Sequence, residues 1–336
     1  MMKRKASFWE RRDDKVQCLL CPHNCIIADG KRGICRVREN ESKKLYTLIY
    51  GSASSIAADP IEKKPLYHFY PGSCALSFGT VGCNLSCRHC QNYSISMARP
   101  EDFPLHELSP EEPADLAKDR GCRGIAWTYN EPTIWHEFTV DASKIAKKRG
   151  LYVVYVSNGY INEDPFREIG EYLDAINIDI KSFNDRFYRE ITGGHLQPVL
   201  DTCKLAKEMG IHLEITYLII PDLNDSMDDI EKFCTWVYEE LGYNVPVHFT
   251  RFYPHYKMKD RIPTPLETLK KAYDLARKKG LQYVYLGNVS PGDYDNTYCP
   301  KCGALLIERY GFSSEIKNLK EGKCTVCGAK MPVIMD

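Results

Sequence analysis

The stretch 75–92, ALSFGTVGCNLSCRHCQN, decides how the rest of the chain is interpreted. It begins with a short apolar run, residues 75–79, and continues into Cys83, Cys87 and Cys90 with C-x3-C-x2-C spacing. The run has the length and composition of a buried strand, so the cysteines lie in the loop that follows it. Three thiolates this close together can reach three corners of one iron–sulfur cluster. The fourth iron is then open to a substrate, as the free position is in a catalytic zinc site.

The run at 75–79 opens a repeated strand–helix pattern. The predicted strands are residues 75–79, 124–128, 152–157, 175–180, 212–219, 247–252 and 283–286, and the predicted helices are 110–120, 132–149, 198–209 and 266–279. Such a repeat implies a parallel sheet with right-handed crossovers. About six or seven units fit, fewer than the eight of a closed barrel. We therefore expect an α/β fold, a partial (β/α)6 TIM-like barrel, with a doubly wound open sheet as the alternative.

Polar residues follow the predicted strands at their carboxyl ends, where ligands bind in either architecture. They are Thr128-Tyr129-Asn130-Glu131, Ser157-Asn158-Gly159, Asp179-Ile180-Lys181 and His248. Asp179 and Lys181 are two residues apart, so both point to the same face of their strand. Each residue alone also fits an ordinary cap or loop hydrogen bond. Groups of polar residues at several successive strand ends, taken together, indicate one shared site.

A structural zinc site is the alternative for the three-cysteine loop, with His89 as a candidate fourth ligand. A structural site rarely sits at the mouth of a barrel directly after its first strand. The position of Cys83, Cys87 and Cys90 therefore favours a catalytic cluster.

The composition is that of a globular protein, with 43% hydrophobic and 27% charged residues. Lys plus Arg and Asp plus Glu are both 45, a net charge of zero that argues against a main role on nucleic acid. The N-terminal residues resemble no signal peptide, and no run is long enough to span a bilayer. We therefore expect a cytoplasmic protein, in which 15 cysteines indicate metal sites rather than disulfides. Four scattered cysteines, Cys74, Cys122, Cys203 and Cys234, are expected to be small buried side chains.

Two further cysteine groups flank the barrel, so we expect a metal-binding segment at 1–70, the barrel at 71–290 and a small domain at 291–336. The C-terminal group has the C-x2-C…C-x2-C spacing of a zinc ribbon and comprises Cys299, Cys302, Cys324 and Cys327. A structural zinc ion is the preferred interpretation there, over an auxiliary cluster or a docking ribbon. The N-terminal group, Cys18, Cys21, Cys25 and Cys35, fits either zinc, which we slightly favour, or a second iron–sulfur cluster.

The three-cysteine loop resembles the radical S-adenosylmethionine (SAM) superfamily. Its C-N-L-x-C-x-x-C-x-N form is similar to that of pyruvate formate-lyase activating enzymes, with His89 where Tyr or Phe is usual. Tyr129-Asn130-Glu131 stands where activases carry Gly-Gly-Glu, a departure from a plain pyruvate formate-lyase activase. The strand-end stretches and both flanking cysteine groups resemble the AmmeMemoRadiSam group over nearly the whole chain.

The resemblance implies a [4Fe-4S] cluster on Cys83, Cys87 and Cys90 whose fourth iron chelates SAM. One-electron reduction then yields methionine and a 5′-deoxyadenosyl radical, which abstracts a hydrogen atom. The implied contacts to SAM are stacking by His89 on adenine, Asn130 and Glu131 at the amino group, Ser157 and Asn158 at the carboxylate or ribose, and His248 at the ribose. Asp179 and Lys181 are implied to line the pocket for SAM and substrate as catalytic residues.

The resemblance also implies partners. These are a low-potential electron donor, flavodoxin or ferredoxin, and either a glycyl radical enzyme or Memo-like and AMMECR-type proteins. The substrate is a small molecule or a protein that the sequence does not identify. A non-catalytic iron–sulfur or zinc protein, acting as electron carrier or adaptor, is the alternative from another class. The polar strand ends argue against it, because a carrier needs no pocket of the size of SAM.

Overall fold

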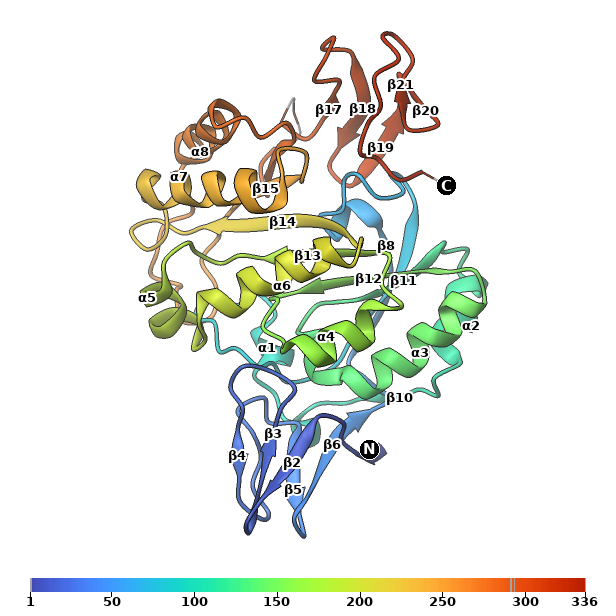
Figure 1. Cartoon of the computed structure of the whole chain (residues 1–336), viewed down its shortest axis with the longest axis vertical. Helices are drawn as coiled ribbons and strands as arrows, with labels where there is room; N and C mark the ends of the chain where they lie inside the picture. Colours follow the sequence, from blue (N-terminus) through green and yellow to red (C-terminus); the bar gives the residue numbers. More distant parts are fainter. Residues whose placement is uncertain (1, 291, 293, 336) are drawn as a thin grey trace.

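An eight-stranded sheet forms the centre of the molecule in the computed structural model, which describes residues 2–290, 292 and 294–335 (Figure 1). Across the sheet the strands are β16 (Val284–Gly287), β15 (Val247–Arg251), β14 (His212–Ile219), β13 (Ala175–Asp179), β12 (Tyr152–Ser157), β11 (Gly124–Trp127), β9 (Cys74–Gly79) and β8 (Ser55–Pro60). Neighbours from β9 to β16 are parallel, and β8 is antiparallel to β9.

The strand order distinguishes the two predicted architectures. From β9 to β16 the order in space follows the order in the chain without a reversal. A doubly wound sheet reverses its order at a switch point, whereas a barrel does not. The partial barrel is therefore confirmed. All seven predicted strands are present as its parallel strands, one more than the six of the expected (β/α)6 barrel. In addition, β8, from the segment expected at 1–70, belongs to its sheet.

Helices connect the parallel strands. They are α1 (Tyr93–Ser96), α2 (Glu112–Asp119), α3 (His136–Lys148), α4 (Glu163–Gly170), α5 (Asp185–Phe187), α6 (Leu196–Glu208), α7 (Met227–Trp236) and α8 (Leu266–Lys278). Shorter turns occupy Ile61–Lys63, Pro100–Asp102, Pro132–Trp135, Tyr188–Thr192 and Val237–Leu241. The predicted helices at 110–120, 198–209 and 266–279 match α2, α6 and α8 within a few residues. Sequence reasoning did not single out α4 and α7.

The predicted helix at 132–149 is divided. Residues Pro132–Trp135 form a 3-10 turn, and α3 follows it. The side chain of Glu131 accepts a hydrogen bond from the backbone N–H of Thr133, which satisfies a donor at the start of the turn. The expected end is confirmed, because α3 stops at Lys148 and Gly150 has a φ of 77° that favours glycine.

Small sheets lie at the two ends of the long axis in Figure 1. At the N-terminal end two three-stranded sheets are formed, and β7 pairs with β10. These strands are β1 (Met2–Lys5), β2 (Trp9–Arg12), β3 (Lys15–Cys18), β4 (Ile26–Ile27), β5 (Arg38–Glu41), β6 (Lys44–Tyr50), β7 (Ser52–Ala53) and β10 (His106–Glu107). At the other end are β17 (Thr297–Tyr298), β18 (Leu305–Tyr310), β19 (Ser313–Ile316), β20 (Leu319–Lys320) and β21 (Lys323–Cys324).

Buried charges join both end units to the barrel. Arg38 of β5 pairs with Glu137 of α3 at 2.5 Å, and both side chains are almost fully buried. Arg309 of β18 donates to the carbonyl oxygen of Tyr67 at 2.6 Å and lies over the Tyr67 ring. Because a buried charge is tolerated only when paired, these contacts fix how the end units dock.

Cys74 and Cys122 correct one expectation, since they form a disulfide rather than two separate buried thiols. Cys74 begins β9 and Cys122 lies just before β11, and these neighbouring strands are in register at Ala75 and Gly124. The pairing thus follows from strand register, which the sequence spacing did not reveal. Cys203 and Cys234 are buried and unpaired, as expected.

No helix within the described part of the chain is both long enough and apolar enough to span a bilayer. The cytoplasmic location stays a prediction.

The Arg38–Glu137 pair generates a prediction about stability. Replacing Glu137 by Ala leaves the Arg38 guanidinium buried without its partner, and we expect a loss of about 3–5 kcal/mol in the free energy of unfolding. Urea denaturation followed by circular dichroism measures it. The control is Glu163→Ala, which removes an exposed pair with Arg167 and should cost about 0.5 kcal/mol. Equal effects of the two substitutions would contradict this account of docking.

Candidate active site

A cavity of about 770 Å³ opens at the carboxyl ends of the parallel strands. This volume is typical of a small-molecule or cofactor site. All the predicted barrel-site residues except Glu131 line it: Cys83, Cys87, His89, Cys90, Asn130, Ser157, Asn158, Asp179, Lys181 and His248. The structure therefore brings together residues from the ends of five strands.

The three-cysteine loop is held by backbone hydrogen bonds to the segment after β13. Ser86 N donates to Thr192 O at 2.7 Å, and Arg88 N donates to Ile191 O at 3.0 Å. The thiols of Cys83 and Cys87 are buried, and that of Cys90 is half-buried. Burial raises the pKa of Cys87 to about 11, although the nearby Lys181 charge acts in the opposite direction. A metal bound here would favour the thiolate form of Cys87, because metals take thiolates as ligands.

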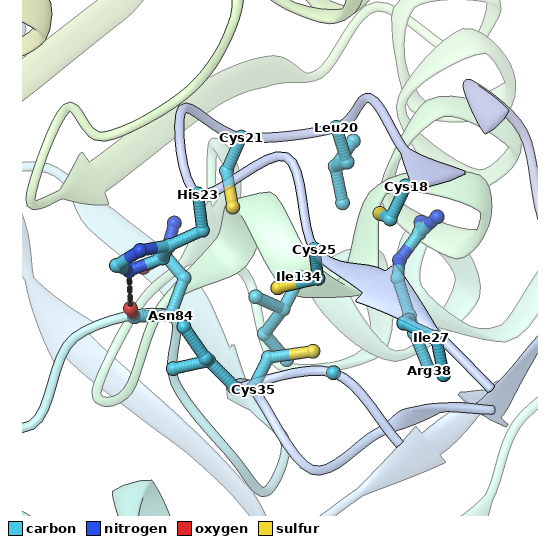
Figure 2. Close-up of a pocket in the computed structure, with 12 residues that line it drawn as sticks. Cys18, Leu20, Cys21, His23, Cys25, Ile27, Cys35, Arg38, Asn84 and Ile134 are labelled. Carbon is cyan, nitrogen blue, oxygen red and sulfur yellow. Dashed lines mark hydrogen bonds between the residues drawn. The ribbon is translucent and has the colours of Figure 1, made fainter. Parts of the chain in front are cut away.

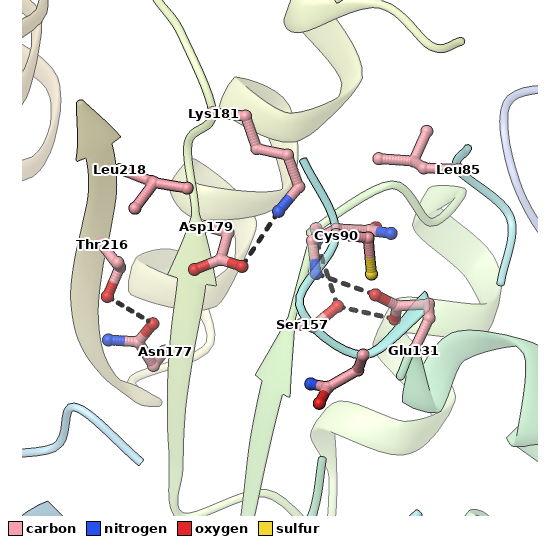
Figure 3. Close-up of polar contacts among 12 residues, drawn as sticks. Leu85, Cys90, Glu131, Ser157, Asn177, Asp179, Lys181, Thr216 and Leu218 are labelled. Atoms are coloured by element: carbon pink, nitrogen blue, oxygen red, sulfur yellow. Dashed lines mark hydrogen bonds and ion pairs between the residues drawn. The ribbon is translucent and has the colours of Figure 1, made fainter. Parts of the chain in front are cut away.

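Glu131 does not line the cavity, and its carboxylate connects the ends of β11 and β12 by hydrogen bonds. It is 1% exposed and accepts three hydrogen bonds, from Thr133 N at 2.9 Å and from Ser157 Oγ and Asn158 N at 2.8 Å each. Figure 3 shows its carboxylate turned toward Ser157. Burial raises the pKa of Glu131, while the three hydrogen bonds favour the charged form. This arrangement does not fit the expected direct contact with SAM and makes Glu131 a positioning residue.

Asn130 and Asn158 also act on the cysteine loop. Asn130 Oδ1 accepts from Thr80 N at 3.1 Å, and its Nδ2 donates to Gly82 O at 2.8 Å. Asn158 Nδ2 lies 3.8 Å from Cys83 Sγ and donates to Asn84 Oδ1 at 2.9 Å. Both amides line the cavity, but their strongest contacts orient the loop that carries the sulfurs.

Asp179 and Lys181 form an ion pair inside the cavity, with Nζ and Oδ2 3.0 Å apart (Figure 3). The predicted common orientation of the two side chains is confirmed. Burial opposes the positive charge of Lys181, but Asp179 and Cys87 outweigh it and raise the pKa of Lys181 above its ordinary value. The pair thus offers one acceptor and one donor to a zwitterionic ligand.

His89 and His248 supply ring surfaces. His89 is 5% exposed, and its Nδ1 has no hydrogen-bond partner among the described residues. Burial lowers the pKa of His89 to about 3, so the ring is neutral. His248 donates from Nε2 to the buried carboxylate of Glu214 at 2.7 Å and stacks on Tyr285. Glu214 is a positioning residue that sequence reasoning missed, because it lies in the middle of an apolar strand.

Further cavity residues come from outside the predicted set. Lys64 is buried, and its Nζ pairs with Asp59 at 2.7 Å, while Tyr129 Oη donates to the same carboxylate at 2.5 Å. Burial lowers the pKa of Lys64 to about 8. From the C-terminal unit, Asp295 and Phe312 also line the cavity. These residues lie far in sequence from the strand ends, and no local pattern marks them.

The donor set fits a SAM-sized ligand beside a three-cysteine cluster. SAM carries an ammonium, a carboxylate and an adenine, and the cavity offers Asp179, Lys181 and the neutral ring of His89 for these groups. The unpartnered Nδ1 of His89 is a buried polar atom that calls for a ligand.

The flanking cysteines differ in geometry. In the C-terminal unit the Sγ atoms of Cys299 and Cys327 are 3.6 Å apart, and those of Cys302 and Cys324 are 3.7 Å apart. All four ligand atoms lie within 4.8 Å of one another, so this group can hold a metal ion. The four N-terminal cysteines, Cys18, Cys21, Cys25 and Cys35, line one pocket (Figure 2).

Comparisons with known proteins bear on this arrangement. A model of the Radical SAM superfamily matches residues 78–237. A protein of Methanocaldococcus jannaschii, described as uncharacterized, is 48% identical over 335 residues, which span 99% of this chain and 100% of that protein. The chain belongs to the radical SAM superfamily. The cluster and SAM expected at the cavity are those that this family implies.

Two other proteins are also similar to this radical SAM enzyme. The pyruvate formate-lyase-activating enzyme of Clostridium pasteurianum is 26% identical over 209 residues, covering 56% of this chain and 84% of that enzyme. A radical SAM methyltransferase from Sphaerobacter thermophilus has a solved structure with a TM-score of 0.51 and 16% identity, over 70% of this chain and 71% of that one. The second likeness supports the fold alone. Membership of the AmmeMemoRadiSam group stays a prediction.

The Glu131 carboxylate yields a prediction for this radical SAM enzyme. In Glu131→Gln, an NH2 group replaces one carboxylate oxygen. An NH2 group does not accept hydrogen bonds, so at least one of the three donors loses its acceptor. Losing a hydrogen bond to a buried charge costs about 1.5–3 kcal/mol, so we expect the Kd for SAM to rise about tenfold or more. Isothermal titration calorimetry on the anaerobically reconstituted protein measures it. Unchanged SAM affinity, matching that of the surface control Glu163→Gln, would refute the positioning role.

Proposed function

We propose that the protein uses a [4Fe-4S] cluster on Cys83, Cys87 and Cys90 to cleave SAM reductively. SAM bound there supplies, on one-electron reduction, a 5′-deoxyadenosyl radical that takes a hydrogen atom from a substrate. The observation that carries this proposal is the single cavity that contains the three cysteines together with the polar strand ends. A non-catalytic electron carrier needs no such cavity, and the family supports an enzyme.

The chain's own residues have distinct tasks in this proposal. Asp179 and Lys181 bind the charged ends of SAM, and His89 and His248 hold its adenosine part against ring surfaces. Glu131, Asn130 and Asn158 keep the cysteine loop and the strand ends in place. Rigid positioning matters because a carbon radical reacts with any C–H bond within reach, so only one must be offered to it.

We place the substrate beside the part of the cavity wall that comes from outside the strand ends. This part of the wall includes Lys64, Tyr67 and Asp295, and the tip of the β18–β19 hairpin contributes Phe312. Burial raises the pKa of Asp295 to about 6, since Arg309 only partly offsets it. We propose a polar small molecule as the substrate of this cavity.

An activase role is the second candidate, favoured by the relatives that activate pyruvate formate-lyase. In that case the substrate is a glycyl radical enzyme. Either role requires a low-potential one-electron donor, for which flavodoxin or ferredoxin is our expectation. Memo-like and AMMECR-type partners remain predictions from the resemblance.

SAM cleavage tests the proposal directly. The anaerobically reconstituted protein, reduced with dithionite, should form 5′-deoxyadenosine from SAM, and Cys87→Ala should form none because a cluster ligand is lost. Liquid chromatography with mass detection measures the product. The control Cys203→Ala alters a buried cysteine outside the cavity and should retain cleavage. Absence of deoxyadenosine from the reconstituted wild type would overturn the proposal.

We further propose that the C-terminal group holds zinc. Zn–S bonds of about 2.3 Å in a tetrahedron place sulfurs about 3.8 Å apart, close to the 3.6 and 3.7 Å distances between paired sulfurs here. Cys324 and Cys299 are also part of the small apolar core of this unit. The ion would therefore stabilise a domain with little core of its own.

Removal of one zinc ligand gives the corresponding prediction. In Cys302→Ser, whose side chain is exposed, we expect zinc content to fall by about one ion per chain and residues 297–335 to become sensitive to protease. Plasma mass spectrometry and limited proteolysis measure the two effects. The matched control is Lys301→Ala, which alters an exposed side chain within the same knuckle and should leave the zinc in place. Unchanged zinc content in Cys302→Ser would contradict the assignment.

A further inference from the structure

The four N-terminal thiols surround a shared space but do not gather as closely as the C-terminal four. Figure 2 shows the sulfurs of Cys18, Cys21, Cys25 and Cys35 around one pocket. All four are described by the structure, and no three of them have ligand atoms that all lie within 4.8 Å of one another, unlike the four of the C-terminal unit. The metal group with ligand atoms within 4.8 Å found among the described residues is the C-terminal one.

The catalytic loop provides an internal comparison. The sulfurs of Cys83, Cys87 and Cys90, which the structure also describes, likewise do not all lie within 4.8 Å of one another. In an iron–sulfur cluster each thiolate binds a different iron, whereas in a zinc site all four bind one ion. Wider spacing is therefore the geometry of a cluster. The N-terminal set resembles the catalytic set and not the ribbon.

A buried cation faces the N-terminal sulfurs. Arg38 is 1% exposed and lines the pocket, and its Nε has no hydrogen-bond partner among the described residues. Its Nη2 pairs with Glu137 and its Nη1 donates to the carbonyl oxygen of Ser7, so Nε is the nitrogen left without a partner among the described residues. A cluster with four thiolates is an anion whose sulfur atoms accept hydrogen bonds.

Backbone amides complete the surroundings. Backbone N–H groups of His23, Ile34 and Val37 favour the charged forms of the Cys21, Cys25 and Cys35 thiols respectively. Hydrogen bonds to sulfur are among the factors that set a cluster's reduction potential. These donors fit four thiolates that carry negative charge.

The N-terminal site adjoins the catalytic loop. His23, two residues after Cys21, contacts the carbonyl oxygen of Asn84 through Nε2 at 2.7 Å, and Asn84 directly follows Cys83. Gly82 lies so close to the same segment that a Cβ there would be 2.6 Å from Cys35 O. Cys21 and Cys35 share one buried core with Cys83 and Cys87.

We propose that Cys18, Cys21, Cys25 and Cys35 bind a second [4Fe-4S] cluster that relays single electrons to the cluster on Cys83, Cys87 and Cys90. An external low-potential one-electron donor reduces the N-terminal cluster. That cluster is reoxidised when the electron passes to the catalytic cluster, and no bond or proton is exchanged in the N-terminal unit. On the outer side Ile26 and Ile34 are 63% and 49% exposed, which brings the site near the surface.

Metal analysis of a variant without the catalytic ligands tests the site. In the full-length triple variant Cys83→Ala/Cys87→Ala/Cys90→Ala, reconstituted anaerobically, we expect about four iron ions and about one zinc ion per chain. The reduced sample should give an electron paramagnetic resonance signal that SAM does not alter. An iron-free variant with about two zinc ions overturns the proposal. If the variant does not fold, the iron content of the reconstituted wild type is measured instead. About eight iron ions per chain support two clusters, and about four overturn the proposal.

A second measurement tests the relay, which rests on the proposed function. Cys18→Ser/Cys21→Ser should lose deoxyadenosine formation driven by reduced flavodoxin while still forming it with titanium(III) citrate, which reaches the catalytic cluster directly. The matched control is Cys203→Ser/Cys234→Ser, at two buried cysteines outside both sites. Equal activity of the N-terminal variant with both reductants overturns the relay. Absence of SAM cleavage in the wild type is a failure of the proposed function, whereas the iron count of the triple variant is independent of it.

Discussion

The Glu131 carboxylate holds together the part of the molecule on which the site depends. It is buried where β11 and β12 end and accepts hydrogen bonds from the turn after β11 and from both Ser157 and Asn158. Asn158 in turn reaches Cys83 and Asn84 in the cysteine loop. A change at Glu131 is therefore transmitted through the Asn158 amide to Cys83, a proposed cluster ligand, although Glu131 neither lines the cavity nor contacts a sulfur.

The three cysteine groups differ in the spacing of their sulfur atoms. The four C-terminal sulfurs all lie within 4.8 Å of one another, as binding of a single ion requires. The sulfurs of neither of the other two groups, all of which the structure describes, meet this criterion. The N-terminal unit packs on the cysteine loop, and the C-terminal unit contributes Phe312 to the cavity. The two appendages thus adjoin the site from different directions, one through the loop and one through the cavity wall.

Much of the barrel was predictable because its strands are continuous apolar runs with polar residues at their ends. Residues 152–157 and 212–219 were predicted with the bounds of β12 and β14. The cysteine spacing and the strand-end residues Asp179 and Lys181 could also be recognised from the sequence as candidate site residues. The role of Glu131 was not, because a carboxylate at a strand end looks the same in sequence whether it binds a ligand or a neighbouring strand.

Long-range contacts account for the features of the structure that the sequence did not predict. Lys64 is held in the cavity by Asp59 of the antiparallel strand β8, and Phe312 comes from a hairpin more than 200 residues after the cysteine loop. The Cys74–Cys122 pair depends on the register of β9 against β11. None of these leaves a periodic or local signal, since each depends on how separate elements pack.

The central claim is that SAM binds the open iron of the cluster on Cys83, Cys87 and Cys90. Electron–nuclear double resonance on the reduced protein with SAM labelled at its amino nitrogen and carboxylate measures this directly. We predict hyperfine coupling of both labels to the cluster. Bound SAM without such coupling would contradict the account.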